Sequence, residues 1–137
     1  MTALYDAVGK AIISTGKRLS HIAESERPEK IIFLIQTDGE ENASKKHTLK
    51  DVKSMIKEQQ EKYSWEFVFL GSNIDAVGVA TDIGIRQDRA MKYANNPQGT
   101  RDAFCSLSSN LASYRRGEKV DMSYEDKDLD AQKKAGV

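Results

Sequence analysis

A chain of 137 residues with 39% hydrophobic content is long enough to bury one core of its own, so we expect a single domain. Its 21 basic residues balance its 21 acidic residues, which argues against a nucleic-acid-binding protein, because such proteins carry a basic excess. No apolar stretch approaches the roughly 18 residues of a membrane span. The single cysteine, Cys105, fits a reducing cytosol, so we expect a cytoplasmic protein.

Helices alternate with strands along the first 117 residues of the chain. Apolar residues recur at helical spacing from residue 3 to about 24, and a polar loop then leads to an apolar strand at 31–36. A capping box formed by Thr48 and Asp51 begins a second helix. The later elements are a strand at 65–70, a short helix at 74–82, a weak strand at 89–93, a breaker at 95–97 and a last helix capped by Thr100.

Strands that are separated by helices need crossover connections, and strands joined in this way pair in parallel. The alternation therefore predicts an α/β fold with three αβα layers, in which helices flank a mostly parallel sheet of about three strands. We expect this domain to cover residues 1–117.

The last twenty residues differ in character from the rest of the chain. Residues 118–137 are rich in Lys, Asp and Glu, and their few large apolar groups show no periodicity. Such a segment buries too little apolar surface to offset its ordering entropy. We therefore predict a charged, solvated tail, with an ordered docking arm as the alternative.

Asp38 lies at a position where α/β proteins commonly bind their ligands. The apolar run 31–35 leads into Asp38 and a turn at Gly39, and ligands of open parallel sheets bind outside the carboxyl ends of the strands. Oxygen ligands of this kind suit a hard cation such as Mg²⁺. The alternative is an aspartate that only stabilises a turn by accepting backbone N–H bonds.

Other polar residues follow the two main strands and are candidates for a rim that binds a partner. Two groups fall at these places: Glu40, Glu41 and Asn42 after the first strand, and Ser72, Asn73 and Asp75 after the second. The first group could equally be a solvated loop. In the second group, Asn73 or Asp75 could instead cap the short helix that follows.

Several segments together resemble a known family. The segment 31–42 with its Thr37-Asp38-Gly39 turn, the start at Thr2 to Ala7, and the segments 63–76 and 113–117 are similar to von Willebrand factor A domains of the bacterial and phage type. The resemblance covers residues 2 to about 117 and implies a Rossmann-like fold with a metal-ion-dependent adhesion site. It assigns Asp38 and Thr2 as metal ligands.

The chain lacks one part of that site. The family also uses an Asp-x-Ser-x-Ser segment at the end of a first, central strand, and this sequence contains none. Judged against the family, the chain begins in the middle of the fold, on the order of 70 residues in by ordinary element lengths, and Met1 could be an internal methionine. The resemblance therefore implies Mg²⁺, Mn²⁺ or Ca²⁺ only if the missing segment is supplied, and otherwise no cofactor.

The missing segment has a physical consequence for the strand at 31–36. In the family this strand lies beside the absent one, so here its hydrogen-bonding edge is expected to be exposed, and an apolar exposed edge is a template for pairing. We therefore expect a homo-oligomer or a hetero-complex, in which a second copy or another protein covers the edge.

Three functions compete on these observations. The first is a non-enzymatic protein–protein interaction module with an incomplete metal site. The second is a truncated domain that acts as a homodimeric structural or interaction protein without a metal. The third is a hydrolase that uses Asp38, and we rank it last because the sequence has no phosphate loop, no nucleophile elbow and no Cys–His or Ser–His pair at recognisable spacing.

Overall fold

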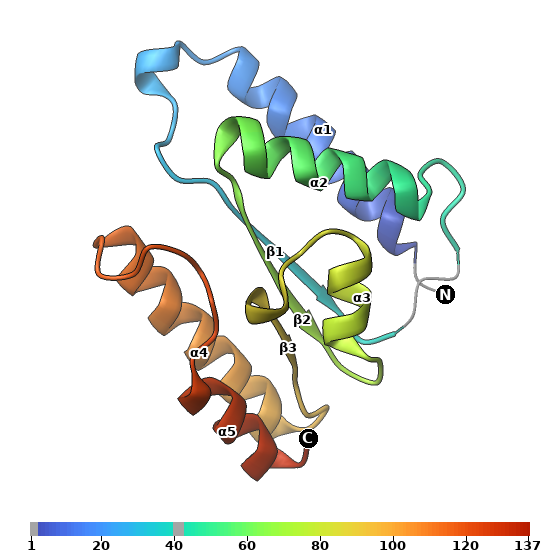
Figure 1. Cartoon of the computed structure of the whole chain (residues 1–137), viewed down its shortest axis with the longest axis vertical. Helices are drawn as coiled ribbons and strands as arrows, with labels where there is room; N and C mark the ends of the chain where they lie inside the picture. The colour runs from blue at the N-terminus through green and yellow to red at the C-terminus, as the bar shows by residue number, and fades with distance from the viewer. Residues whose placement is uncertain (1–2, 40–42) are drawn as a thin grey trace.

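The computed structural model describes residues 3–39 and 43–137. Two short 3₁₀ turns, η1 and η2, accompany the helices and strands (Figure 1). In chain order the elements are α1 (Leu4–Ser20), η1 (Glu24–Glu26), β1 (Ile32–Thr37), α2 (Leu49–Tyr63), β2 (Glu66–Gly71), α3 (Ala76–Asp82), η2 (Gln87–Arg89), β3 (Ala90–Lys92), α4 (Pro97–Arg115) and α5 (Asp126–Ala135).

The three strands form one parallel sheet in the order β1-β2-β3. Leu34 of β1 lies opposite Val68 of β2, and Leu70 of β2 lies opposite Met91 of β3. Helices flank the sheet on both faces, so the predicted α/β class with a parallel sheet of about three strands is confirmed.

Helices α1, α2 and α3 cover one face of the sheet (Figure 1). Phe67 and Phe69 of β2 are fully buried beneath them, and the rings of Phe33 and Trp65 stack with centroids 5.4 Å apart. Aromatic side chains supply much of the apolar area buried in this layer. The alternating aromatic residues of the second strand therefore belong to the core.

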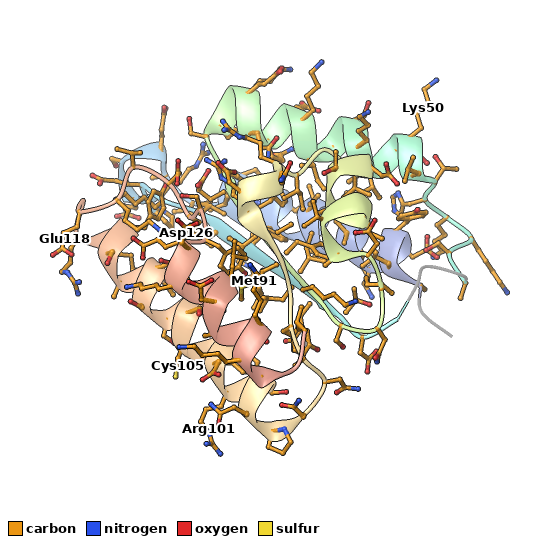
Figure 2. All side chains as sticks on the ribbon, turned by 60° about the horizontal axis from the view of Figure 1, so that its bottom comes forward. Lys50, Met91, Arg101, Cys105, Glu118 and Asp126 are labelled. Carbon is orange, nitrogen blue, oxygen red and sulfur yellow. The ribbon has the colours of Figure 1, made fainter. Side chains whose placement is uncertain are left out.

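Helix α4 covers the opposite face of the sheet (Figure 1). Val68, Leu70 and Met91 of the sheet pack there against Ala103 and Tyr114 of α4. Figure 2 shows Met91 within the molecule, whereas Arg101 and Cys105 project from the outer side of α4. The fold thus has two separate apolar clusters, one on each side of β2.

Local signals explain where the helices begin. The capping box of α2 is present: the Asp51 N–H donates to Thr48 Oγ1 at 3.2 Å, and the Thr48 N–H donates to Asp51 Oδ2 at 2.9 Å. Helix α4 begins earlier than predicted, at Pro97, because Asn96 Oδ1 accepts the Gly99 N–H at 2.7 Å. Proline suits the first helical position, where its missing N–H is not needed, so the predicted breaker is in fact the start of the helix.

The last twenty residues differ from the predicted solvated tail. Residues 118–137, called the C-terminal arm below, carry helix α5, which packs against α4. Met122 and Tyr124 of the arm are buried in the cluster under α4. The Tyr124 N–H also donates to the Asp88 carbonyl at 2.7 Å, which ties the arm to the turn before β3. The arm is thus part of the packed domain.

Buried polar contacts hold the arm where apolar residues are few. Gln132 is 1% exposed; its Oε1 accepts the Ala94 N–H at 2.9 Å and its Nε2 donates to the Gly99 carbonyl at 2.8 Å. Asp128, also buried, accepts from Asn110 Nδ2 at 3.1 Å. A polar group is costly to bury when it has no hydrogen-bond partner, and these groups have theirs. This is why a charged segment can be ordered here.

Candidate functional site

The predicted site residues that the structure describes lie at the carboxyl ends of β1 and β2. Thr37 of β1 pairs with Gly71 of β2, so the chain leaves both strands at the same edge of the sheet. Asp38 comes directly after β1, and three further residues come after β2: Ser72, Asn73 and Asp75. The other predicted site residues, Thr2, Glu40, Glu41 and Asn42, lie outside the described residues.

Asp38 and Asn73 lie side by side at this edge. Asp38 is exposed, and its backbone carbonyl accepts a hydrogen bond from Asn73 Nδ2 at 3.3 Å. Asn73 has a φ of 60°, in the left-handed region that asparagine tolerates better than most residues. The two turns are thus joined by a hydrogen bond from the Asn73 side-chain amide to the backbone, while Asp38 itself is exposed.

Ser72 and Asp75 lie in different environments at this edge of the sheet. Ser72 is fully buried, and its Oγ has no hydrogen-bond partner within the described part of the chain. Asp75 Oδ1 accepts the Gly78 N–H at 3.1 Å and so caps α3, which was the alternative interpretation of this residue. The Ser72 side chain is therefore hidden from a partner, whereas Asp75 caps α3 and is also exposed.

A divalent cation needs several oxygen ligands converging on one point. Within residues 3–39 and 43–137, no group of three or more His, Cys, Asp or Glu side chains is placed to hold a metal. Asp38 is the only described residue of the two ligands that the family resemblance assigns. Among the described residues, Asp38 thus stands as a candidate ligand without a cluster of further carboxylates around it.

Asp6 has a role that the sequence analysis missed. Its two carboxylate oxygens accept three backbone N–H groups, from Lys45 at 2.8 Å, Lys46 at 2.9 Å and His47 at 2.8 Å. The Asp6 N–H in turn donates to Ser44 Oγ at 3.1 Å. These bonds fasten the loop before α2 to the first turn of α1. Because the partners are about 40 residues apart in sequence, no local pattern signals the contact.

These hydrogen bonds lower the pKa of Asp6, with the Lys45 N–H as the largest cause. A lowered folded pKa gives stability that is full above the unfolded value of about 3.9 and is lost as the pH falls through the folded pKa. We therefore expect Asp6→Asn to lower the urea midpoint at neutral pH and to flatten its fall below about pH 4. Urea titrations followed by circular dichroism across this pH range would measure both effects.

The control for Asp6 is Asp130→Asn, which removes the same charge from an exposed position on α5. We expect this variant to keep the wild-type urea midpoint and its pH dependence. Equal behaviour of the two variants would show that the loop contact of Asp6 contributes nothing measurable.

Within residues 3–39 and 43–137, no strand covers the outer edge of β1. Alternate residues of a parallel strand bond to a given neighbour. In β1 these are the odd-numbered residues, because the carbonyls of Ile31 and Thr37 accept the N–H groups of Glu66 and Ser72 at 2.9 and 3.0 Å. The N–H and C=O groups of Ile32, Leu34 and Gln36 therefore point away from β2. No described residue pairs with them.

Apolar side chains accompany this edge on the α4 side of the sheet. Leu34 is 37% exposed, and Ile32 is partly buried against the same cluster as Leu107 and Leu111 of α4. Phe104, which is 43% exposed, shares that flank of α4 because residues three and four apart lie on one helix face. The open edge and an exposed apolar flank are thus neighbours.

Comparison of the chain with models of protein families, with curated proteins and with solved structures gives no match. The resemblance to von Willebrand factor A domains therefore rests on the sequence motifs. Among the described helices, none is both long enough and apolar enough to cross a bilayer.

Proposed function

We propose that this chain is a non-enzymatic protein–protein interaction module whose contact surface is the open edge of β1. The observation that carries the proposal is the row of outward backbone groups on Ile32, Leu34 and Gln36. Unpaired edges of this kind accept an added strand, whose main-chain hydrogen bonds supply affinity.

The surroundings of the edge support a protein partner over a small ligand. Leu34 stands on the edge strand itself, and the flank of α4 adds Phe104, so apolar surface lies beside the unpaired backbone. A partner strand would pair the backbone groups and cover these side chains together. Many proteins protect such an edge with charged residues or proline, but β1 contains neither.

The proposal includes the family resemblance. A strand that ends in Thr37 and is followed by Asp38 and Gly39 agrees with a von Willebrand factor A domain whose adhesion site is incomplete. Because the outward backbone groups of β1 pair with a strand through hydrogen bonds that need no metal, we expect association through β1 to be indifferent to Mg²⁺ and to EDTA.

Leu34→Pro tests the edge. Proline removes an N–H that faces outward and makes no bond to β2, so the sheet keeps its internal ladder while the added strand loses a partner. We expect the wild-type chain to associate at micromolar concentration and the variant to associate at least about tenfold more weakly. Analytical ultracentrifugation measures the association, and amide hydrogen exchange shows whether the outward N–H groups are protected.

The control is Ile13→Lys, because Ile13 is 45% exposed on α1 and lies on another element. It removes a comparably exposed apolar side chain and should leave association unchanged. A wild-type chain that remains monomeric, with the amides of Ile32, Leu34 and Gln36 exchanging freely, would overturn the proposal.

A further inference from the structure

We infer that the partner at the β1 edge is a second copy of this chain, with the two β1 strands antiparallel and Leu34 of each copy opposite Leu34 of the other. This inference rests on the proposed function and adds to it the partner and the register. Its basis is that the edge of β1 is complementary to itself in backbone, charge and apolar surface.

The backbone restricts the register. Antiparallel strands join residues whose N–H and C=O groups both face the partner, so Ile32, Leu34 and Gln36 must pair among themselves. Placing Leu34 opposite Leu34 also sets Ile32 opposite Gln36 of the other copy, and every outward group then finds a partner. A shift by two residues in either direction leaves some of these groups unpaired.

Charge favours the same register. In this alignment Lys30 falls opposite Asp38 of the second copy, and the two-fold symmetry makes this pair twice. Lys30 is half-buried on the α4 side of the sheet, where its Nζ donates to the Tyr114 carbonyl and lies 4.4 Å from the centroid of the Tyr114 ring. Asp38 is exposed beyond the other end of β1. Opposite charges facing each other across strands stabilise the pair, whereas like charges destabilise it.

The apolar surfaces also meet. A two-fold axis through the Leu34 pair runs perpendicular to the sheet, so both copies carry α4 on the same side of the joined sheet. The Leu34 side chains, 37% exposed in one copy, would contact each other there. The flanks of the two α4 helices, with Phe104 exposed on each, would face each other above them. Closed two-fold assemblies of this kind are the commonest homo-oligomers.

Cysteine cross-linking tests the register. In a background with the native thiol removed by Cys105→Ser, Leu34→Cys is expected to form a disulfide-linked dimer under mild oxidation. Directly paired residues have Cα atoms about 5.5 Å apart, within the range that a disulfide spans. Ile32→Cys and Gln36→Cys should each fail to link with themselves, but an equal mixture of the two should give the 32–36 cross-link.

Charge reversal tests the same alignment without a covalent bond. Lys30→Asp and Asp38→Lys each place like charges opposite one another twice, and each should weaken the dimer by about tenfold. Their mixture should form a heterodimer of nearly wild-type affinity, because both pairs become opposite again. Circular dichroism of each variant alone establishes whether it folds. If Lys30→Asp does not fold, the cysteine cross-links alone decide the register.

The outcomes separate the two levels of the proposal. A dimer with the Leu34→Cys cross-link and the charge rescue supports both. If the chain associates and its edge amides are protected, but Leu34→Cys forms no cross-link, the inferred Leu34–Leu34 pairing is wrong. The proposal of an interaction module at the β1 edge then still holds. A monomer with unprotected edge amides overturns both.

Discussion

Deletion of residues 118–137 is expected to unfold the domain or leave it with a loosely packed core. The C-terminal arm contributes Met122, which is 1% exposed, and Tyr124, which is 9% exposed, to the cluster under α4. Burying two such side chains is worth about 3–6 kcal/mol, and the loss of Gln132 leaves the Ala94 N–H without its acceptor. Because whole domains are stable by only about 5–15 kcal/mol, the truncated chain should lose its cooperative urea transition.

Point variants within the arm serve as controls for the deletion. Met122→Ala should lower the free energy of unfolding by about 2–5 kcal/mol, as is typical for large buried side chains. Val120→Ala, at a position that is 94% exposed, should leave it unchanged. A truncated chain that keeps the wild-type thermal midpoint would mean that the arm is a solvated tail after all.

Sequence patterns carried the prediction of the sheet because the patterns were local. The runs at 31–35 and 67–70 are apolar throughout, and the structure places strands at Ile32–Thr37 and Glu66–Gly71. A strand that is covered on both faces can be predicted from its own apolar composition. The capping box at the start of α2 is equally local, since both of its residues stand within one turn.

The arm and the loop contact of Asp6 could not be found in this way. Gln132 and Asp128 look like surface residues in the sequence, and they are buried because Ala94, Gly99 and Asn110 supply hydrogen bonds from elsewhere in the chain. Counting the hydrophobic residues of a segment does not detect hydrogen-bond partners elsewhere in the chain. Polar residues that become core through distant contacts are therefore the class that sequence patterns miss here.

The candidate site was predicted in part for the same reason. The position of Asp38 beyond an apolar strand follows from local pattern, and the structure places it at the carboxyl end of β1. The burial of Ser72 and the contact between Asn73 and the Asp38 carbonyl depend on the pairing of β1 with β2. Which of these polar side chains face solvent is set by the pairing of the two strands, which no local pattern reveals.

Arg89 should be the costliest single charge to remove from this protein. Its side chain, 10% exposed, bonds Glu66 at 3.2 Å and Asp88 at 3.1 Å and lies 3.5 Å from Asp121. Glu66 Oε1 also accepts the Met122 N–H at 2.8 Å, so the cluster joins β2 to the C-terminal arm. Arg89→Ala leaves Glu66, itself only 15% exposed, without a cation. We expect a loss of about 3–5 kcal/mol in the free energy of unfolding, measured by urea titration.

Arg86→Ala provides the comparison, because Arg86 makes an exposed ion pair with Asp88 at 3.3 Å. Exposed pairs contribute at most about 1 kcal/mol, so this variant should remain close to wild type. Combining Arg89→Ala with Glu66→Ala should cost less than the sum of the two single changes, because the double variant no longer buries an unpaired carboxylate. Strict additivity would mean that Arg89 acts through packing alone, and the link between β2 and the arm would then be apolar rather than ionic.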